Sequence, residues 1–463
     1  MIVMKFGGSS LALPARLEAA ADLVAEARRR GRRPCVVLSA MGDTTDELLA
    51  AARAAEIGDA SAVELATAAF ERSAAAATEV LGDATEAVAT LATLREAAIV
   101  LLRGVAMLRE LTPRTSDAIL AHGERVSTAI FAAILAERGL AVGELDAREV
   151  MRTDDRFGRA RPDPAVIRDL ADRRIAPLLQ AGTIVVTQGF VGATERGFTT
   201  TLGRGGSDWS AALIGAALGV EEVQIWTDVE GVLTADPRAV PDARPVPVLS
   251  PAEAAELAAF GARVLHPATI QPAIEAGIPV TVRHTLRPGG AFSTIDPRKR
   301  PSARGVAALA SRGPVTVLTM TSTRMLATAG YLARLFAVFG ELDICVDLVV
   351  TAEVSVACTV EPDAPIDRLV RALDGLARVE IARDRAIVVA VGEGLRRNAL
   401  VVERACRALR PIVPELIGMG GNDRNLSFVI HQNEVGPAMP RLHAEFFGDA
   451  GAALPVAADE AMS

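Results

Sequence analysis

The sequence predicts an α/β protein with an open, mostly parallel sheet, followed by two smaller α+β sandwiches. Short apolar strands alternate with Ala-rich helical patterns over residues 1–300, and a strand-helix-strand-strand pattern then occurs twice. Alternation of this kind is typical of parallel sheets covered on both faces. Tandem copies of one unit indicate repeated small domains.

The first βαβ unit is the clearest element of the predicted sheet. Residues 2–6 and 34–39 are apolar strand candidates, and residues 11–30 between them carry apolar side chains at helical spacing. Further strands are predicted at 183–188, 223–226 and 279–283, and helices at 209–218 and 251–260. In such sheets, ligands bind at the carboxyl ends of the strands.

Residues 287–304 predict a domain boundary, because prolines and glycines gather there among basic residues. We therefore expect one domain over 1–300 and a second region over 301–463. The two copies in that region are predicted at 315–320, 330–339, 344–349 and 354–360, and at 386–391, 400–409, 413–419 and 426–431. Residues from about 450 onward predict a loose tail.

Composition narrows the classes of partner. Aromatic residues make up only 3% of the chain and the formal net charge is -8, so nucleic acid is not expected as a partner. Apolar stretches such as 97–102 are shorter than a membrane span of about 18 residues, and the N-terminal apolar run is too short for a secretory signal. We expect a cytoplasmic protein without a membrane helix.

The cysteines and histidines predict no metal site. Cys35, Cys345, Cys358 and Cys406 show no CxxC spacing, and reduced thiols in the core are the expected state. Histidines 284, 431 and 443 have no metal-binding spacing with any carboxylate.

Two glycine-rich motifs carry the chemistry. Residues 5–10, Lys-Phe-Gly-Gly-Ser-Ser, follow the first strand, where glycines let the backbone approach a phosphate and Lys5 adds a positive charge. Alone, this motif is equally compatible with a tight turn. Residues 199–208, Thr-Thr-Thr-Leu-Gly-Arg-Gly-Gly-Ser-Asp, are more specific, because they combine hydroxyls, an arginine suited to a carboxylate and an acidic group at a helix start. A simple helix cap explains only one of these ten residues.

These motifs, together with residues 116–127, which contain His122-Gly123-Glu124, and with Gln188-Gly189-Phe190, Trp226-Thr227-Asp228 and residues 260–267, resemble the aspartate kinase family over nearly the whole chain. The lysine-sensitive, monofunctional branch is the most similar. The resemblance implies an amino-acid kinase fold followed by two ACT domains, the first at about 313–385 and the second at about 301–312 plus 386–450. It also implies transfer of the ATP γ-phosphate to the side chain of L-aspartate, the first step toward lysine, threonine and methionine.

The resemblance assigns roles to individual residues. Lys5 would stabilise the transferring phosphoryl group and Asp208 would hold that lysine. Aspartate would be bound by Thr45, Glu124 and Arg204, with Ser39 and Ser207 as further candidates. ATP, carrying Mg²⁺, would be bound by Lys5, Phe6, Gly7, Gly8, Thr227, Asp228, Leu233, Arg238 and Arg263. Leu233 stands where that branch usually has tyrosine and Arg263 where it often has lysine, so the nucleotide site departs from the family pattern there.

The resemblance also predicts regulation by lysine, with threonine as the main alternative effector. The predicted effector-binding residues are Met325, Gly330, Tyr331, Leu332, Val346, Asp347, Thr351 and Glu353. ACT pockets form between subunits, which implies a homodimer or a larger oligomer. Two other classes remain open at this point: a kinase acting on glutamate or acetylglutamate, which would lack the ACT pair, and a non-catalytic amino-acid sensor, against which Lys5, Arg204 and Asp208 together argue.

Overall fold

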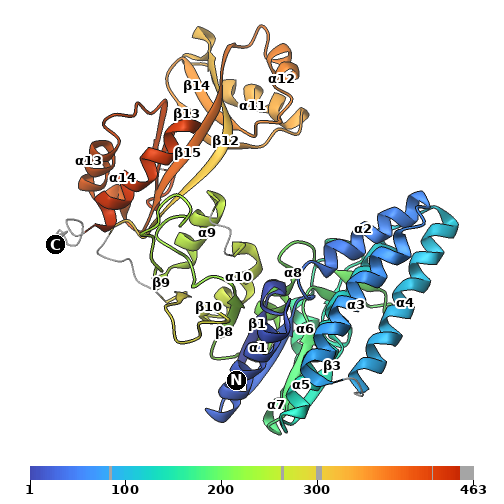
Figure 1. Ribbon diagram of the computed structural model, residues 1–463. Helices are drawn as coiled ribbons and strands as arrows, with labels where there is room; N and C mark the ends of the chain where they lie inside the picture. Colours follow the sequence, from blue (N-terminus) through green and yellow to red (C-terminus); the bar gives the residue numbers. More distant parts are fainter. Residues whose placement is uncertain (83–85, 262–264, 299–304, 420, 449–463) are drawn as a thin grey trace. The chain divides into compact units, whose positions relative to one another are not determined.

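The computed structural model describes residues 1–82, 86–261, 265–298, 305–419 and 421–448, and it divides the chain into two compact units (Figure 1). The first unit comprises Met1–Val232 and Val264–Lys299, and the second comprises Leu233–Arg263 and Arg300–Ser463. One division lies between Lys299 and Arg300, near the predicted boundary. Leu233–Arg263 falls within the range predicted for the first domain, and it packs with the second unit.

The first unit contains a long parallel sheet and most of the helices. Its elements are β1 (Ile2–Phe6), η1 (Gly8–Ser10), α1 (Pro14–Arg29), β2 (Pro34–Leu38), α2 (Thr44–Ile57), α3 (Ala62–Leu81), α4 (Glu86–Leu108), α5 (Pro113–Glu137), β3 (Val142–Leu145), η2 (Ala147–Glu149), β4 (Arg152–Thr153), α6 (Pro164–Arg174), α7 (Ala176–Gln180), β5 (Ile184–Gln188), β6 (Val191–Thr194), β7 (Thr199–Thr201), α8 (Gly206–Leu218), β8 (Val223–Thr227), α10 (Pro267–Glu275), β10 (Val280–His284) and β11 (Ser293–Ile295).

The sheet of the first unit has the strand order β3-β5-β2-β1-β8-β10-β11. All neighbours are parallel except β10 and β11, which confirms the predicted open, mostly parallel sheet. Phe6, at the end of β1, pairs with Leu38 of β2 and with Trp226 of β8. The carboxyl ends of these central strands are therefore level with one another.

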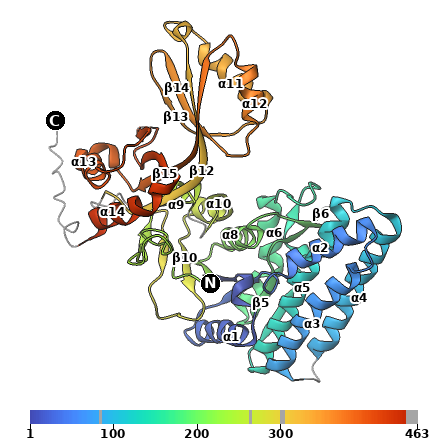
Figure 2. The ribbon, with the colours of Figure 1, turned by 45° about the horizontal axis from the view of Figure 1, so that its top comes forward.

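Helices α2, α3, α4 and α5 lie beside one another in the first unit (Figure 2). The sequence pattern predicts no particular elements for this part of the chain. By length and composition alone, α5 is the one helix among the described residues that could cross a membrane, but 83% of its most apolar window is buried inside the protein. That burial is typical of a core helix.

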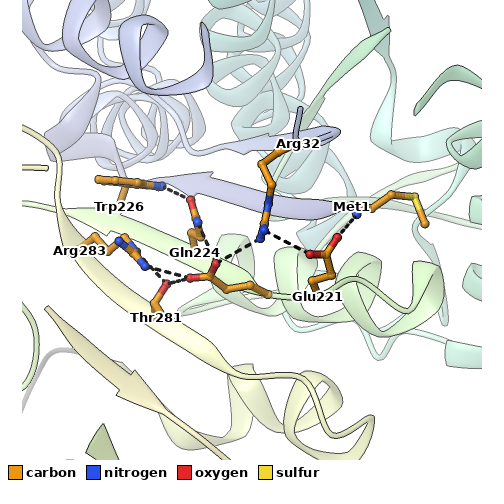
Figure 3. Close-up of polar contacts among 8 residues, drawn as sticks. Met1, Arg32, Glu221, Gln224, Trp226, Thr281 and Arg283 are labelled. Carbon is orange, nitrogen blue, oxygen red and sulfur yellow. Dashed lines mark hydrogen bonds and ion pairs between the residues drawn. The ribbon is translucent and has the colours of Figure 1, made fainter. Parts of the chain in front are cut away.

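A polar network joins the amino ends of the central strands (Figure 3). Glu221 accepts a 2.7 Å hydrogen bond from the amino group of Met1, and Arg32 contacts both Glu221 and Glu222. Glu222 also accepts hydrogen bonds from Thr281 at 2.6 Å and from Arg283 at 3.2 Å. Since these residues precede or lie on β1, β2, β8 and β10, the network supports the strand register at the end opposite the glycine turn.

The second unit is an antiparallel α+β structure. Its elements are β9 (Val248–Leu249), α9 (Pro251–Ala259), β12 (Ala308–Thr321), η3 (Thr323–Met325), α11 (Tyr331–Glu341), β13 (Val346–Thr351), β14 (Ser355–Val360), α12 (Ile366–Ala372), β15 (Arg378–Val391), η4 (Leu395–Arg397), α13 (Ala399–Ala408), β16 (Leu416–Met419), β17 (Asn425–His431), η5 (Gln432–Glu434) and α14 (Val435–Phe447).

Six strands of this unit form one sheet in the order β13-β14-β12-β15-β17-β16. The long strand β12 serves both repeats: residues 308–312 pair with 387–391 of the second, and residues 315–321 pair with 378–385, on the side of the first. Each repeat has its own apolar core, one with α11 and α12 and the other with α13 and α14. The predicted pair of sandwiches is confirmed, with the early strand added to the later repeat. Helices α12 and α14 were not predicted.

The four cysteines are free. Cys35 and Cys358 are buried, and burial raises the pKa of each thiol to about 12. Cys345 and Cys406 are exposed. The expectation of core thiols is therefore correct for Cys35 and Cys358 and wrong for Cys345 and Cys406.

Candidate active site

An ion pair stands at the carboxyl ends of the central strands. Lys5, on β1, points its ammonium at Asp208, with 2.7 Å between Nζ and Oδ1. Both side chains are largely buried, at 11% and 16% exposed. Asp208 lies in the first turn of α8, where an acidic side chain is favoured by the helix dipole. The structure thus brings together the two residues predicted to be catalytic.

Glycines let the backbone pack closely around this pair. A Cβ on Gly7 would lie 3.5 Å from Lys5 Nζ, so the ammonium folds over this glycine. A Cβ on Gly8 would meet the carbonyl oxygens of Ala40 at 2.8 Å and Gly42 at 2.9 Å, which excludes any larger residue. Residues 8–10 form a single 3-10 turn, and the helix predicted over 11–30 begins at Pro14.

The second motif is partly strand and partly turn. Residues Thr199–Thr201 form β7, paired with β6, and only the following residues form the turn into α8. Gly203 and Gly205 adopt positive φ angles of 78° and 72°, a region that favours glycine. Its threonines therefore belong to a separate three-stranded sheet of β4, β6 and β7.

Glu124 provides an unusual buried carboxyl group on α5. It is 3% exposed, and its Oε1 accepts a 3.3 Å hydrogen bond from the backbone N-H of Ala40. The other oxygen, Oε2, is buried without a hydrogen-bond partner. Burial raises the pKa of Glu124 to about 8, despite the hydrogen bond from Ala40. A buried acceptor without a donor is what an incoming ammonium group would satisfy.

Gly123 brings Glu124 close to the β2–α2 loop, a role that was not predicted. A Cβ at Gly123 would lie 2.9 Å from Ala40 Cβ and 3.7 Å from the hydroxyl of Thr45. The carbonyl of Ser39 accepts a 2.8 Å hydrogen bond from Ser127, one turn further along α5. A glycine inside a helical pattern is the signal that points to such close packing.

The remaining predicted aspartate-binding residues lie on α8 and the turn before it. Ser207 is buried, and a Cβ on Gly189 would meet its side chain at 2.6 Å, which places α8 tightly against the end of β5. Arg204 is exposed and makes no ion pair or hydrogen bond with any residue of the described ranges. Its guanidinium is therefore available for an anionic ligand.

The other predicted nucleotide residues differ in their exposure and in the compact unit to which they belong. The side chain of Phe6 is fully buried and stacked on Trp226, with ring centroids 6.1 Å apart, so only its backbone can serve a ligand. Thr227 and Asp228 lie at the end of β8, the first half-buried and the second exposed. Leu233 and Arg238 belong to the second unit, where Arg238 is paired with Asp236. Arg263 lies outside the described residues.

The predicted effector residues lie in the first repeat of the second unit, near the start of α11 and along β13. Gly330 caps α11 with a positive φ of 75°, and Leu332 is exposed. Met325 packs against the apolar core of the first repeat. The side chain of Tyr331 is buried and donates a hydrogen bond to the carbonyl of Leu376, so it is not free for a ligand.

The other predicted effector residues lie on or beside β13, an edge strand of the sheet. Val346 is half-buried at its start, whereas Thr351 and Glu353 are exposed near its end. Asp347 is already paired with Arg312, at 2.8 Å between Oδ1 and Nη1. An effector's ammonium would have to compete with this guanidinium.

Comparison with known proteins decides the family. The model of the amino acid kinase family matches residues 1–284. Aspartokinase 1 of Arabidopsis thaliana is 37% identical over 96% of this chain and 80% of its own length, and the lysine-sensitive aspartokinase 3 of Escherichia coli is 37% identical over 96% and 99%. This chain belongs to the aspartokinase family.

Solved structures agree with this assignment. Two crystal structures of E. coli aspartokinase III, one with aspartate and ADP in the R-state and one with lysine and aspartate in the T-state, are 36% identical. Each has a TM-score of 0.79, covers 96% of this chain, and is itself covered to 100% and 99%, respectively. The predicted fold class and the predicted class of enzyme, a phosphotransferase, are confirmed.

Proposed function

We propose that this protein transfers the γ-phosphate of ATP to the side-chain carboxylate of L-aspartate. The observation that carries the proposal is the buried, unpartnered Oε2 of Glu124 in the same unit as the Lys5–Asp208 pair and the unpaired Arg204. An α-amino acid has one ammonium and one α-carboxylate, which Glu124 and Arg204 complement. Thr45, Ser39 and Ser207 would contribute further polar contacts. The E. coli relative was solved with aspartate and ADP.

The reaction needs positioning and charge neutralisation rather than a general base. The accepting carboxylate is already ionised at neutral pH, so its oxygen can attack the γ-phosphorus directly, with ADP leaving on the opposite side. Lys5 meets the negative charge of the transferring group, and Asp208 fixes the ammonium of Lys5 in place. Gly7, which has no side chain, lets the ammonium of Lys5 lie close to the backbone where the phosphates would bind.

Mg²⁺ would reach the site on the nucleotide. Within the described ranges there is no group of three or more His, Cys, Asp or Glu side chains that could hold a metal ion. Mg²⁺ characteristically keeps several waters and binds through substrate phosphates, which suits this set of residues. When bound, it neutralises phosphate charge. Thr227, Asp228, Leu233, Arg238 and Arg263 remain our proposed nucleotide contacts.

Lysine is our proposed inhibitor, acting at the first repeat of the second unit. The E. coli relative was solved with lysine and aspartate. Because β13 is an edge strand with half of its residues exposed, it can pair with a second copy, and we propose a homodimer or larger oligomer through the ACT domains. A cytoplasmic location, where ATP is available, completes the proposal.

A hydroxylamine trapping assay tests the activity. Purified protein with Mg²⁺ and ATP would be given aspartate, glutamate or N-acetylglutamate in parallel, and the acyl phosphate would be trapped as its hydroxamate. We expect product from aspartate alone. Product from either alternative acceptor would favour another amino-acid kinase, and the absence of product from all three would favour a non-catalytic sensor.

A further inference from the structure

A buried carboxylate on α5 has no role in the site described so far. Asp117 is 1% exposed and accepts three hydrogen bonds. Its Oδ2 accepts from the backbone N-H groups of Gly158 and Thr201, both at 2.9 Å, and its Oδ1 accepts from the hydroxyl of Thr201 at 2.7 Å. One side chain therefore joins α5, the loop at Gly158 and the end of β7.

These partners lead directly into the turn that carries Arg204. Thr201 is the last residue of β7, three positions before Arg204. The Arg204 turn also packs against the loop at Gly158, because a Cβ on Gly203 would lie 3.1 Å from the carbonyl oxygen of Gly158. A 2.9 Å hydrogen bond from Ala160 N-H to the Thr201 carbonyl adds a further tie. Arg204 itself has no partner in the described chain, so its position depends on these backbone contacts.

Helix α5 also carries Glu124, seven residues after Asp117. At 3.6 residues per turn, positions seven apart lie on the same face of a helix, about 10 Å apart along its axis. Glu124 reaches the β2–α2 loop at Ala40, and Asp117 reaches the end of β7. The two ends of the proposed aspartate site are thus attached to one face of a single rigid helix.

We propose that Asp117 is a positioning residue for the acceptor site: it holds the Arg204 turn at a set distance from Glu124, so that one amino acid can engage both. This inference rests on the proposed function. It predicts that Asp117 affects the binding of aspartate and has little effect on the binding of ATP.

Asparagine and alanine should behave differently at position 117. The side-chain oxygen of asparagine can accept from both backbone N-H groups, while its NH₂ group donates to the Thr201 hydroxyl, so Asp117→Asn can keep all three contacts. Asp117→Ala instead leaves the buried N-H of Thr201 without an acceptor and removes the acceptor of the N-H of Gly158, which lies in an exposed loop. Asp163 offers a matched control, because it also accepts from two backbone N-H groups, those of Ala165 and Val166, but at the exposed start of α6.

The test measures the KM values for aspartate and for ATP in the parent and in Asp117→Ala, Asp117→Asn and Asp163→Ala. For Asp117→Ala we expect the aspartate KM to rise about 10- to 100-fold, the range that one unsatisfied buried donor implies, with the ATP KM within about threefold of the parent. Asp117→Asn should recover most of the loss, and Asp163→Ala should leave both constants within about threefold, because its N-H groups are accessible to water.

Three results would overturn the inference: an unchanged aspartate KM in Asp117→Ala, an equal rise for both substrates, or an Asp117→Asn variant as impaired as the alanine variant. If Asp117→Ala does not fold, Thr201→Val decides, with an expected rise of about three- to tenfold in the aspartate KM alone. An unchanged constant in that variant also overturns the inference. A parent protein without aspartate-dependent activity would instead refute the proposed function.

Discussion

The predicted sites of the two compact units differ in how far their residues are buried and held in place. In the first unit the polar groups are buried and fixed by several elements, as with Lys5 against Asp208 and Glu124 against Ala40. In the second unit the predicted effector residues are mostly exposed, buried in the core like Tyr331, or paired like Asp347. The difference supports our proposal that one chain can assemble the acceptor site, whereas a second copy would enclose the effector pocket.

The largest effect is expected at the most preorganised contact. Lys5→Ala should lower kcat at least about 100-fold, since loss of one group that stabilises transition-state charge costs about 3 kcal/mol. The aspartate KM should change little. Steady-state kinetics measure both constants, and a thermal unfolding curve controls for the loss of the partner of Asp208. Turnover close to that of the parent would show that Lys5 does not act on the phosphoryl group.

Arg204→Lys tests the exposed end of the same site. A lysine ammonium cannot reproduce the planar, two-pronged contact of a guanidinium with a carboxylate, so the aspartate KM should rise about 20-fold. The ATP KM should stay within about threefold of the parent. Equal changes in the two constants would assign Arg204 to the phosphates or to the fold.

The pH dependence tests Glu124 directly. Its pKa of about 8 lies above the ordinary value of 4.5, so the free protein binds this proton more tightly than the unfolded chain does. Glu124 therefore contributes stability that is complete below pH 4.5 and is lost as the pH rises through about 8.

Aspartate binding should show the opposite trend, because the ligand's ammonium favours the ionised carboxylate. We expect kcat/KM for aspartate to rise about tenfold from pH 7 to pH 9 and to lose this rise in Glu124→Gln. A profile in Glu124→Gln that matches the parent would place the titrating group elsewhere.

The smallest effect is expected in the second unit. Asp347 lies at a solvent-accessible position and already forms an ion pair with Arg312. Its contact with an effector should therefore be weak, because exposed ion pairs contribute little binding free energy. Asp347→Ala should raise the lysine concentration for half-inhibition about two- to fivefold. Parallel titrations with lysine and threonine measure this. Inhibition by threonine alone, or an Asp347→Ala variant inhibited as strongly as the parent, would refute the lysine site.

The sequence predicts the parts of the molecule whose signals are local. The βαβ unit around Lys5, the turn before Asp208 and the two repeats all follow from periodicity, glycines and family resemblance. Asp117 could not be predicted in this way, because its partners Gly158 and Thr201 lie 41 and 84 residues away. A single aspartate within a helix has no distinctive pattern.

Contacts with distant residues also explain why one segment within the predicted first domain packs with the second unit. Residues Leu233–Arg263 pack with the second unit, although the composition changes only near residue 287. Glu256 in α9 accepts a 2.8 Å hydrogen bond from Asn425, and Thr234 contacts His443 at 2.8 Å. These partners are more than 160 residues apart in the chain, as the separations of 169 and 209 show. No local pattern reports such contacts.

An isotope experiment tests the proposed reaction most directly. L-aspartate labelled with oxygen-18 in its side-chain carboxylate would be incubated with the protein, Mg²⁺ and unlabelled ATP, and the acyl phosphate would be cleaved with hydroxylamine. Attack of the carboxylate on the γ-phosphorus makes an aspartate oxygen the bridging atom, and hydroxylamine then releases it with the phosphate. We predict phosphate that carries one oxygen-18 atom. Phosphate without the label, formed at the same rate when aspartate is absent, would show hydrolysis of ATP by water and contradict the account.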